Sequence, residues 1–273
     1  MRSTDHAATV DHVERFLHTD LRLDRIAAAV GYSPHHLHRS FRGTFGLTLH
    51  TYIRRRRLTE AALALATTSE PVLDIAMDHG FGSQQSFTAA FSAVYGAPPA
   101  TWRRTRRYYP LLLPYRFEAA DWELSGTDRF EITGRAAVEE LLSLSLSAVD
   151  MLPALEADRH AEALARCAET HRAMVAHRGG RPAAALLVDP ESGHIDYLAA
   201  HPLARGAMVV SALLGEARSL HPRLSVTTFR EGDRADLGHR RTLLGMAFRP
   251  APLEVEFGYP TQRLDSHPQP TVR

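Results

Sequence analysis

Two similar stretches decide the fold of the first part of the chain: LDRIAAAVGYSPHHLHRSF at residues 23–41 and VLDIAMDHGFGSQQSFTAAF at residues 72–91. Each reads as a short apolar helix, a turn made of glycine and an aromatic residue, and a second helix. Glycine readily takes the positive φ that a sharp turn between helices needs. The pattern therefore predicts paired helix-turn-helix units, each presenting one exposed helix of the kind that reads DNA.

The second helix of the first unit is expected to begin at Ser33, a good N-cap, with Pro34 in the first helical position. Leu37 and Phe41 are four residues apart and predict the buried face. The outer face is expected to contact DNA through Ser33, His35, His36, His38, Arg39 and Arg42. No metal site is expected among the histidines, because the first two are adjacent and point apart.

The second unit repeats this plan, with Ser83 as the expected N-cap and with Phe87 and Phe91 as inner anchors. Its expected DNA contacts are neutral: Ser83, Gln84, Gln85, Ser86 and Thr88. Glutamine can read adenine edges. Because phosphate contacts need cations, most of the salt-dependent affinity is expected to come from the first unit.

A helix over residues 52–66 is predicted between the two units, and it carries a run of four arginines. Arg54, Arg55 and Arg56 are expected to contact DNA phosphates. The alternative is an ordinary solvated face. Arg57 has an alternative of its own, an internal pair with an acid such as Asp74.

The spacing of these residues resembles the AraC-type DNA-binding domain, over roughly residues 8–107. The matched positions are Ile26, Ala27, Gly31-Tyr32-Ser33, Leu37, Arg39, Phe41, Gly46, Tyr52, Arg57-Leu58, Ala61, Ile75-Ala76, Gly80-Phe81, Ser86-Phe87, Phe91, Gly96, Pro99 and Arg103. The resemblance implies seven helices, with one recognition helix from each unit in successive major grooves. This chain departs from the family pattern after Ser86-Phe87, where a basic residue is usual and Thr88-Ala89-Ala90 follows.

The charge of the chain is unevenly distributed. All 32 basic residues are arginine, against 31 acidic residues, for a net charge of +1. Up to Arg107 there are 14 arginines and 9 acids, a net +5, and the remainder carries −4. A basic front and an acidic back suit a polyanion-binding module joined to a different domain.

Other totals exclude several classes of protein. A single cysteine, Cys167, rules out a disulfide framework and a cysteine-based zinc site. No apolar run approaches the ~20 residues of a membrane span. The N-terminal MRSTDHAATV lacks the apolar core of a signal peptide. We therefore expect a cytoplasmic protein without a membrane partner.

Beyond the helical region we expect a linker over 108–128 that packs on the domains, a domain over 129–262 and a flexible tail over 263–273. Strands and helices alternate in the predicted domain, which indicates an α/β (or α+β) fold with a mixed sheet. Strands are predicted at 130–133, 173–177, 183–189, 195–198, 225–229 and 254–257. Helices are predicted at 136–151, 160–170, 207–219 and 233–243.

This second domain resembles the GNAT acetyltransferase superfamily. The resemblance rests on Ile195–Leu198 running into His201-Pro202 and Arg205-Gly206, on Ala212-Leu213-Leu214, and on Leu244-Gly245 through Phe248-Arg249-Pro250. In that superfamily the free N–H groups of this strand-to-helix turn bind the pyrophosphate of acetyl-CoA. The implied ligand-binding residues are Leu198, Ala200, Arg205, Gly206, Ala207 and Met208.

The GNAT pattern is incomplete in ways that affect catalysis. Met208 and Val210 stand where the superfamily favours glycine or alanine, and no tyrosine lies between Tyr197 and Tyr259 to protonate a leaving thiolate. His239 as an acid, and Glu231 or Asp233 as a base, are alternatives that also read as surface residues. No catalytic residue and no metal is assigned.

Three hypotheses follow from these patterns. The first is a transcription regulator that binds double-stranded DNA, with a GNAT-like domain that senses a small ligand or mediates association without turnover. No cofactor is assigned; acetyl-CoA or another acyl-CoA is the ligand class considered, and RNA polymerase is a further partner considered. The second is an active N-acetyltransferase fused to a DNA-binding module. The third replaces the GNAT-like domain by another effector fold, such as the GyrI-like ligand domain.

Overall fold

The computed structural model describes residues 3–105, 108–126, 130–148, 157–205, 207–256 and 258–266. They form two compact units, which we treat separately. The helical unit contains the described residues up to Ala119, and the sheet unit contains those from Ala120 onward. None of the helices in these ranges is long and apolar enough to cross a membrane.

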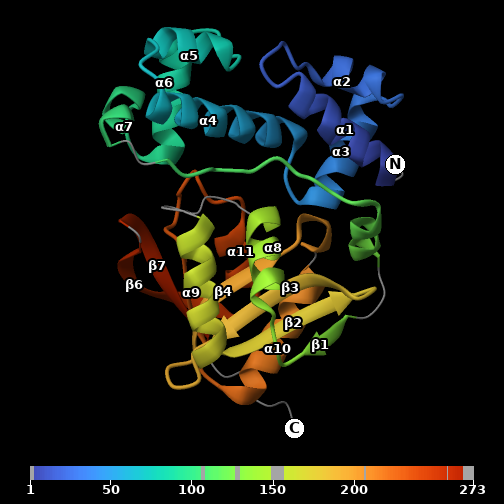
Figure 1. The fold of residues 1–273 in the computed structure, drawn as a ribbon, viewed down its shortest axis with the longest axis vertical. Coiled ribbons are helices and arrows are strands. Elements are labelled where there is room, and N and C mark those ends of the chain that lie inside the picture. Colours follow the sequence, from blue (N-terminus) through green and yellow to red (C-terminus); the bar gives the residue numbers. More distant parts are fainter. Residues whose placement is uncertain are drawn as a thin grey trace. The chain divides into compact units, whose positions relative to one another are not determined.

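The helical unit contains the seven helices that the sequence implied (Figure 1). They are α1 (Ser3–Arg15), α2 (Leu23–Ala29), α3 (Pro34–Phe45), α4 (Leu49–Thr67), α5 (Val72–Asp78), α6 (Gln84–Tyr95) and α7 (Pro99–Thr105). The long α4 joins one group, α1–α3, to a second group, α5–α7. Each group is a helix-turn-helix arrangement with its own aromatic core.

The apolar positions Val10, Val13, Phe16 and Leu17 predict a first helix only from Asp11, but α1 begins at Ser3. The reason is that two polar residues are buried in its first turns. His6 is 4% exposed and Thr9 is fully buried. The hydroxyl of Thr9 donates to the backbone oxygen of Asp5 at 2.7 Å, which satisfies it inside the helix. Hydrophobic periodicity therefore misses this part of the helix.

An extended segment after α7 lies along α4. The backbone N–H groups of Leu111 and Leu112 donate to Thr59 Oγ1 at 3.1 and 3.2 Å. The N–H of Tyr115 donates to the hydroxyl of Tyr52 at 3.2 Å. This part of the expected 108–128 linker therefore packs on the helical unit. A 3₁₀ turn follows, η1 (Ala119–Ser125).

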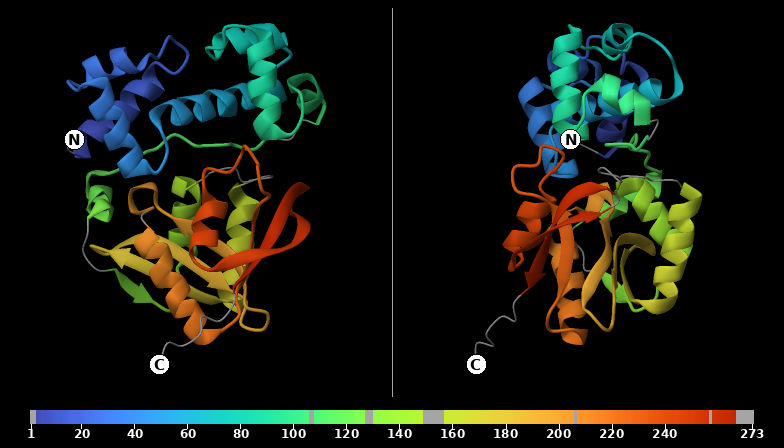
Figure 2. Two further views of the ribbon diagram at one scale, coloured as in Figure 1. Left: turned by 180° about the vertical axis from the view of Figure 1, so that it is seen from behind. Right: turned by 90° about the vertical axis from the view of Figure 1, so that its left-hand side faces the viewer.

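The sheet unit is a mixed seven-stranded sheet in the order β1-β2-β3-β4-β5-β7-β6. Its strands are β1 (Glu131–Thr133), β2 (Arg172–Arg178), β3 (Arg181–Val188), β4 (His194–Ala200), β5 (Ser225–Phe229), β6 (Phe248–Glu256) and β7 (Tyr259–Ser266). Neighbouring strands are antiparallel except β4 and β5, which run parallel. The views in Figures 1 and 2 place α8 (Val138–Ala148) and α9 (Ala157–Thr170) on one face, with α10 (Ala207–Leu220) and α11 (His239–Gly245) on the other.

Two predictions at the end of the sheet unit were wrong. The helix expected over 233–243 begins only at His239, because residues 233–238 form turns in which the carboxylates of Asp233 and Asp236 accept backbone N–H groups. The chain also adds a last strand, β7, that reaches Ser266, whereas a flexible tail was expected from 263. β7 is mostly polar, yet it lies between β5 and β6 and buries Leu264 completely.

Candidate nucleic-acid interface

The first expected recognition helix, α3, is capped as its sequence indicates. The Oγ of Ser33 accepts the N–H of His36 at 3.3 Å, and Pro34 occupies the first position. Leu37, Phe41 and Phe45 are fully buried. The helix ends at Gly46, whose φ of +75° is left-handed, a conformation that costs glycine little.

The second expected recognition helix, α6, has the same construction. The Oγ of Ser83 accepts the N–H of Ser86 at 3.1 Å. Phe87 and Phe91 are fully buried, and Gly96 ends the helix with a φ of +71°. The two helices therefore share a start, an inner face and an end, although their outer faces differ in charge.

The structure places most of the expected DNA contacts at the surface. Exposed side chains are Ser33, His35, Arg39, Arg42, Arg54, Gln84, Gln85 and Ser86. Half-buried side chains are His36, His38, Ser83 and Thr88. The ring of His36 stacks on Tyr32 with centroids 5.0 Å apart, so this histidine also packs within its own unit.

The arginine run on α4 is divided by burial. Arg54 is exposed, whereas Arg55 and Arg56 are 4% and 3% exposed. The structure therefore removes Arg55 and Arg56 from the predicted interface. The reason is geometric: α4 is surrounded by the two helix groups and by the extended segment, so that only part of its circumference meets solvent. A run of four cations cannot all lie on that part.

Arg56 forms a buried ionic cluster instead of a phosphate contact. Its Nε donates to Glu14 Oε1 at 3.0 Å, its Nη2 donates to Glu60 Oε1 at 2.7 Å, and its Nη1 donates to the oxygen of Leu112 at 3.1 Å. The hydroxyl of Tyr52 also donates to Glu14, at 2.7 Å. Burial opposes the charged form, but the hydrogen bonds and charges of Glu14 and Glu60 outweigh it and raise the pKa of Arg56.

Arg57 contacts main-chain oxygens and makes no ion pair with Asp74, the partner considered from the sequence. Its guanidinium donates to the oxygens of Leu17 at 2.8 Å, Thr19 at 2.5 Å and Gly80 at 3.3 Å. Sequence reasoning could not identify these partners, because backbone oxygens carry no residue-type signal.

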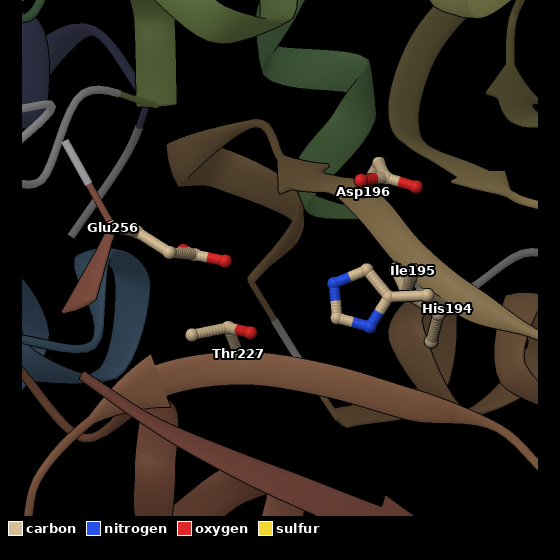
Figure 3. Close-up of a pocket in the computed structure, with 5 residues that line it drawn as sticks. All are labelled: His194, Ile195, Asp196, Thr227 and Glu256. Atoms are coloured by element: carbon tan, nitrogen blue, oxygen red, sulfur yellow. The ribbon is translucent and has the colours of Figure 1, made fainter. Parts of the chain in front are cut away.

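The sheet unit contains a cavity of about 280 Å³ where β4 and β5 separate. These strands pair only at His194 with Ser225 and at Ile195 with Val226. The next residue on each strand, Asp196 and Thr227, lines the cavity together with His194, Ile195 and Glu256 of β6. In Figure 3 the side chains of Glu256, Thr227 and His194 turn toward one space.

The chemistry of this cavity is acidic. Asp196 accepts a hydrogen bond from His171 with a 2.8 Å separation, and Glu256 comes from the opposite side. His194 Nδ1 lies 2.9 Å from the hydroxyl of Ser225. None of these lining residues was among the predicted ligand contacts. The available signal was the alternation of His194 and Asp196 on one strand.

The predicted ligand-binding residues occupy the end of β4 and the start of α10. Leu198 and Ala200 are half-buried on β4, and Arg205 is half-buried after η2 (Pro202–Ala204). Ala207 begins α10, and Met208 is 78% exposed beside it. Gly206 lies outside the described residues. In the described parts of the chain, no group of three or more His, Cys, Asp or Glu side chains is arranged to hold a metal ion.

Known proteins match the helical unit. A family model described as a helix-turn-helix domain matches residues 26–105. The chain is 46% identical over 101 residues to the HTH-type transcriptional activator AarP of Providencia stuartii, covering 37% of this chain and 75% of AarP. It is 45% identical over 93 residues to the right origin-binding protein of Escherichia coli K12, covering 34% of this chain and 32% of that protein.

The chain thus spans about a third of the length of its first curated relatives. Among solved structures, an AraC-type regulator from Chromobacterium violaceum is 27% identical, with 38% of this chain and 92% of that chain covered and a TM-score of 0.36. Family membership rests on the sequence relatives, and it applies to the helical unit. Through this unit, the chain belongs to the AraC-type helix-turn-helix DNA-binding transcriptional regulators.

Proposed function

We propose that the chain is a sequence-specific transcription regulator whose helical unit binds double-stranded DNA through α3 and α6. The observation that carries the proposal is the pair of serine-capped helices, each with a buried aromatic face and an exposed polar face. On α3 that exposed face presents Arg39 and Arg42, and on α6 it presents Gln84 and Gln85. Arginine suits guanine and phosphate, and glutamine suits adenine.

The proposal is tested by selecting duplexes from a random library with the full chain and measuring affinity for the selected duplex. Arg39→Ala is expected to weaken binding to that duplex by about 1–3 kcal/mol if Arg39 reads a base. An equal loss on unrelated duplexes would assign Arg39 to phosphate. Arg166→Ala is the matched control, because Arg166 is an exposed arginine on α9 of the sheet unit. A chain that enriches no sequence would contradict the proposal.

For the sheet unit we propose a GNAT-like effector domain that senses a small ligand or mediates association without turnover. The order of its elements supports this: two helices after the first strand, then a three-strand meander, a helix, the parallel strand β5, a helix and a final hairpin. The fork between β4 and β5 provides the cavity. An acyl-CoA would bind with its phosphates near Arg205, Gly206 and Ala207.

Two observations support the absence of turnover. Met208 projects into solvent from the first turn of α10, beside the proposed phosphate position. The only tyrosine after Tyr197 in the chain is Tyr259, and its hydroxyl already donates to Asp233 at 2.6 Å. A thiolate leaving group would therefore lack the usual acid.

An active N-acetyltransferase is the second candidate, and the acidic cavity favours it. Asp196 and Glu256 would attract a protonated amine into the fork, and a carboxylate can accept the proton that an amine must lose. Asp196 is exposed and bonded to His171, so the pair could pass that proton to solvent.

Calorimetry with acetyl-CoA separates the two candidates. Micromolar binding with thiol release in the presence of amines would overturn the proposal of a domain without turnover. Micromolar binding without thiol release supports a sensor, and millimolar or absent binding supports association or another ligand. For a sensor, acetyl-CoA and the selected duplex must change each other's affinity by the same factor.

A further inference from the structure

Arg57 joins the two helix groups of the helical unit through a small set of contacts that we call the junction. The junction comprises Arg57, the loop 17–19 that follows α1, and the turn 78–80 at the C-terminal end of α5. Arg57 donates to the oxygens of Leu17 and Thr19 on the first group and of Gly80 on the second. One guanidinium therefore holds two chain segments that are about 60 residues apart in the sequence.

A second contact crosses the same place. His18 Nδ1 lies 3.1 Å from the backbone oxygen of Asp78, and the rings of His18 and His79 meet edge to face with centroids 5.0 Å apart. His79 is buried, and its own Nδ1 lies 2.8 Å from the oxygen of Ile75. The junction thus involves both the side chain and the main chain of each segment.

The turn in the second group is shaped to receive Arg57. Gly80 has a φ of +72°, and a Cβ built on it would lie 2.6 Å from the guanidinium carbon of Arg57. A side chain at this position would therefore displace Arg57. Gly31, at the equivalent place in the first group, has a similar φ but open space around it. Of these two equivalent turn glycines, only Gly80 is closely approached by another residue.

In each group, the part of the chain next to the segment held by Arg57 contacts a recognition helix. In the first group, His6 of α1 lies 3.1 Å from Ser40 Oγ and 3.0 Å from Thr44 Oγ1, both on α3. In the second group, the N–H of Phe81 donates to the oxygen of Ala76 at 2.9 Å, and the ring of Phe81 packs against Phe87 of α6. A displacement at the junction would therefore move α3 relative to α6.

We infer that Arg57 is a positioning residue that sets the separation and rotation between α3 and α6, and hence the spacing of the two DNA half-sites that the chain accepts. The inference rests on the proposed function of the helical unit. Two recognition elements on one face of B-DNA lie about 34–36 Å apart, or 10–10.5 base pairs. Each added base pair changes this separation by about 3.4 Å and rotates one site relative to the other. A rigid junction would tolerate such changes poorly.

The test uses the duplex that the full wild-type chain selects, with variants carrying one base pair more or fewer between the half-sites. Wild type is expected to lose about tenfold or more in affinity on either changed duplex, a loss of about 1.4 kcal/mol. Arg57→Leu is expected to bind the selected duplex more weakly, and to lose less than about threefold further on the changed duplexes. Arg57→Lys should lie between them, since a lysine can hold one or two of the three oxygens but lacks the planar fork.

Arg54→Leu is the matched control, because Arg54 is an exposed arginine three residues earlier on the same helix. Arg54→Leu should lower the affinity by the same factor on duplexes of every spacing, as expected for a phosphate contact. His18→Ala is a second variant, for use if Arg57→Leu does not fold. It removes the contact with Asp78, and His18 is exposed. It should also flatten the spacing preference.

An unchanged ratio between spacings in a folded Arg57→Leu chain, or in His18→Ala if that is the folded variant, would overturn the inference and leave DNA binding intact. A wild-type chain that selects no duplex would overturn the proposed function and this inference together.

Discussion

Arg56 is the residue whose removal should cost the helical unit most. Its side chain is buried, and it neutralises Glu14 and Glu60. Arg56→Met would leave two partly buried carboxylates facing each other and is expected to lower the free energy of unfolding by about 3–5 kcal/mol. The measurement is urea denaturation, followed by helical circular dichroism.

Arg54→Met provides the comparison for Arg56, because the same change is made two residues away at an exposed position. It should alter the stability by less than about 0.5 kcal/mol. A loss below about 1 kcal/mol for Arg56→Met would mean that Glu14 and Glu60 are solvated without it, and that the cluster contributes little.

His6 should make the helical unit sensitive to acid. Burial lowers its pKa to about 4, from an ordinary value near 6.5. The unfolded chain therefore binds a proton more readily than the folded one, so stability is present above about pH 6.5 and is lost as the pH falls toward 4. From about pH 7 to pH 5 the loss should be about 2 kcal/mol.

The pH effect is measured by urea denaturation at both pH values, with His6→Gln for comparison. Glutamine can bond to Ser40 and Thr44 but does not titrate, so this variant should lose about 2 kcal/mol less than wild type over the same range. Equal losses in the two proteins would show that His6 is protonated in the folded state without penalty.

At the scale of elements, the caps of α3 and α6 are the features that the sequence specified most directly. Ser33→Ala removes the acceptor for the N–H of His36 and is expected to cost about 1 kcal/mol of stability. Ser33→Asn should restore nearly all of it, because asparagine caps as well as serine. The check is thermal melting of the three proteins, and an asparagine variant as unstable as the alanine variant would rule out capping.

Elements with local signals were predicted well from the sequence. Gly179-Gly180 between two apolar runs specified the hairpin of β2 and β3, and both glycines take positive φ. Residues 233–238 were predicted as helix but form turns. The carboxylates of Asp233 and Asp236 accept nearby N–H groups there, and such bonds compete with helical hydrogen bonds. β7 was not predicted, because its burial comes from the neighbouring strands β5 and β6. The sequence of β7 alone does not indicate those neighbours.

The same distinction between local signals and distant neighbours applies to the residues of the candidate sites. The exposure of Arg39 and Gln84 follows from helical periodicity around the buried Leu37 and Phe87. The burial of Arg56 depends on residues distant in sequence, Glu14 and Leu112 among them. The cavity likewise needs β4, β5 and β6 together. Periodicity within one element gives no information on such contacts.

At the scale of the whole molecule, the charge of the chain overstates what is available to DNA. The front of the sequence has a net charge of +5, but Arg56 is neutralised inside and Arg57 is held by main-chain oxygens. On α3 and α4 the exposed arginines are Arg39, Arg42 and Arg54. The residues after Arg107 have a net charge of −4 and add no net positive charge for binding DNA. Affinity should therefore depend on few phosphate contacts.

The salt dependence of binding measures that number in the intact chain. With about three phosphate contacts, the slope of log K against log salt concentration should be about −3. Arg42→Gln should reduce its magnitude by about one while leaving sequence preference unchanged. The measurement is a titration of the selected duplex at several salt concentrations. A slope near −7 would require several further cations in contact with phosphates. Arg104, exposed at the end of α7, would then be the first residue to replace. If Arg104 contacts a phosphate, the second helix group also supplies salt-dependent affinity, and the predicted difference between the two recognition helices does not hold.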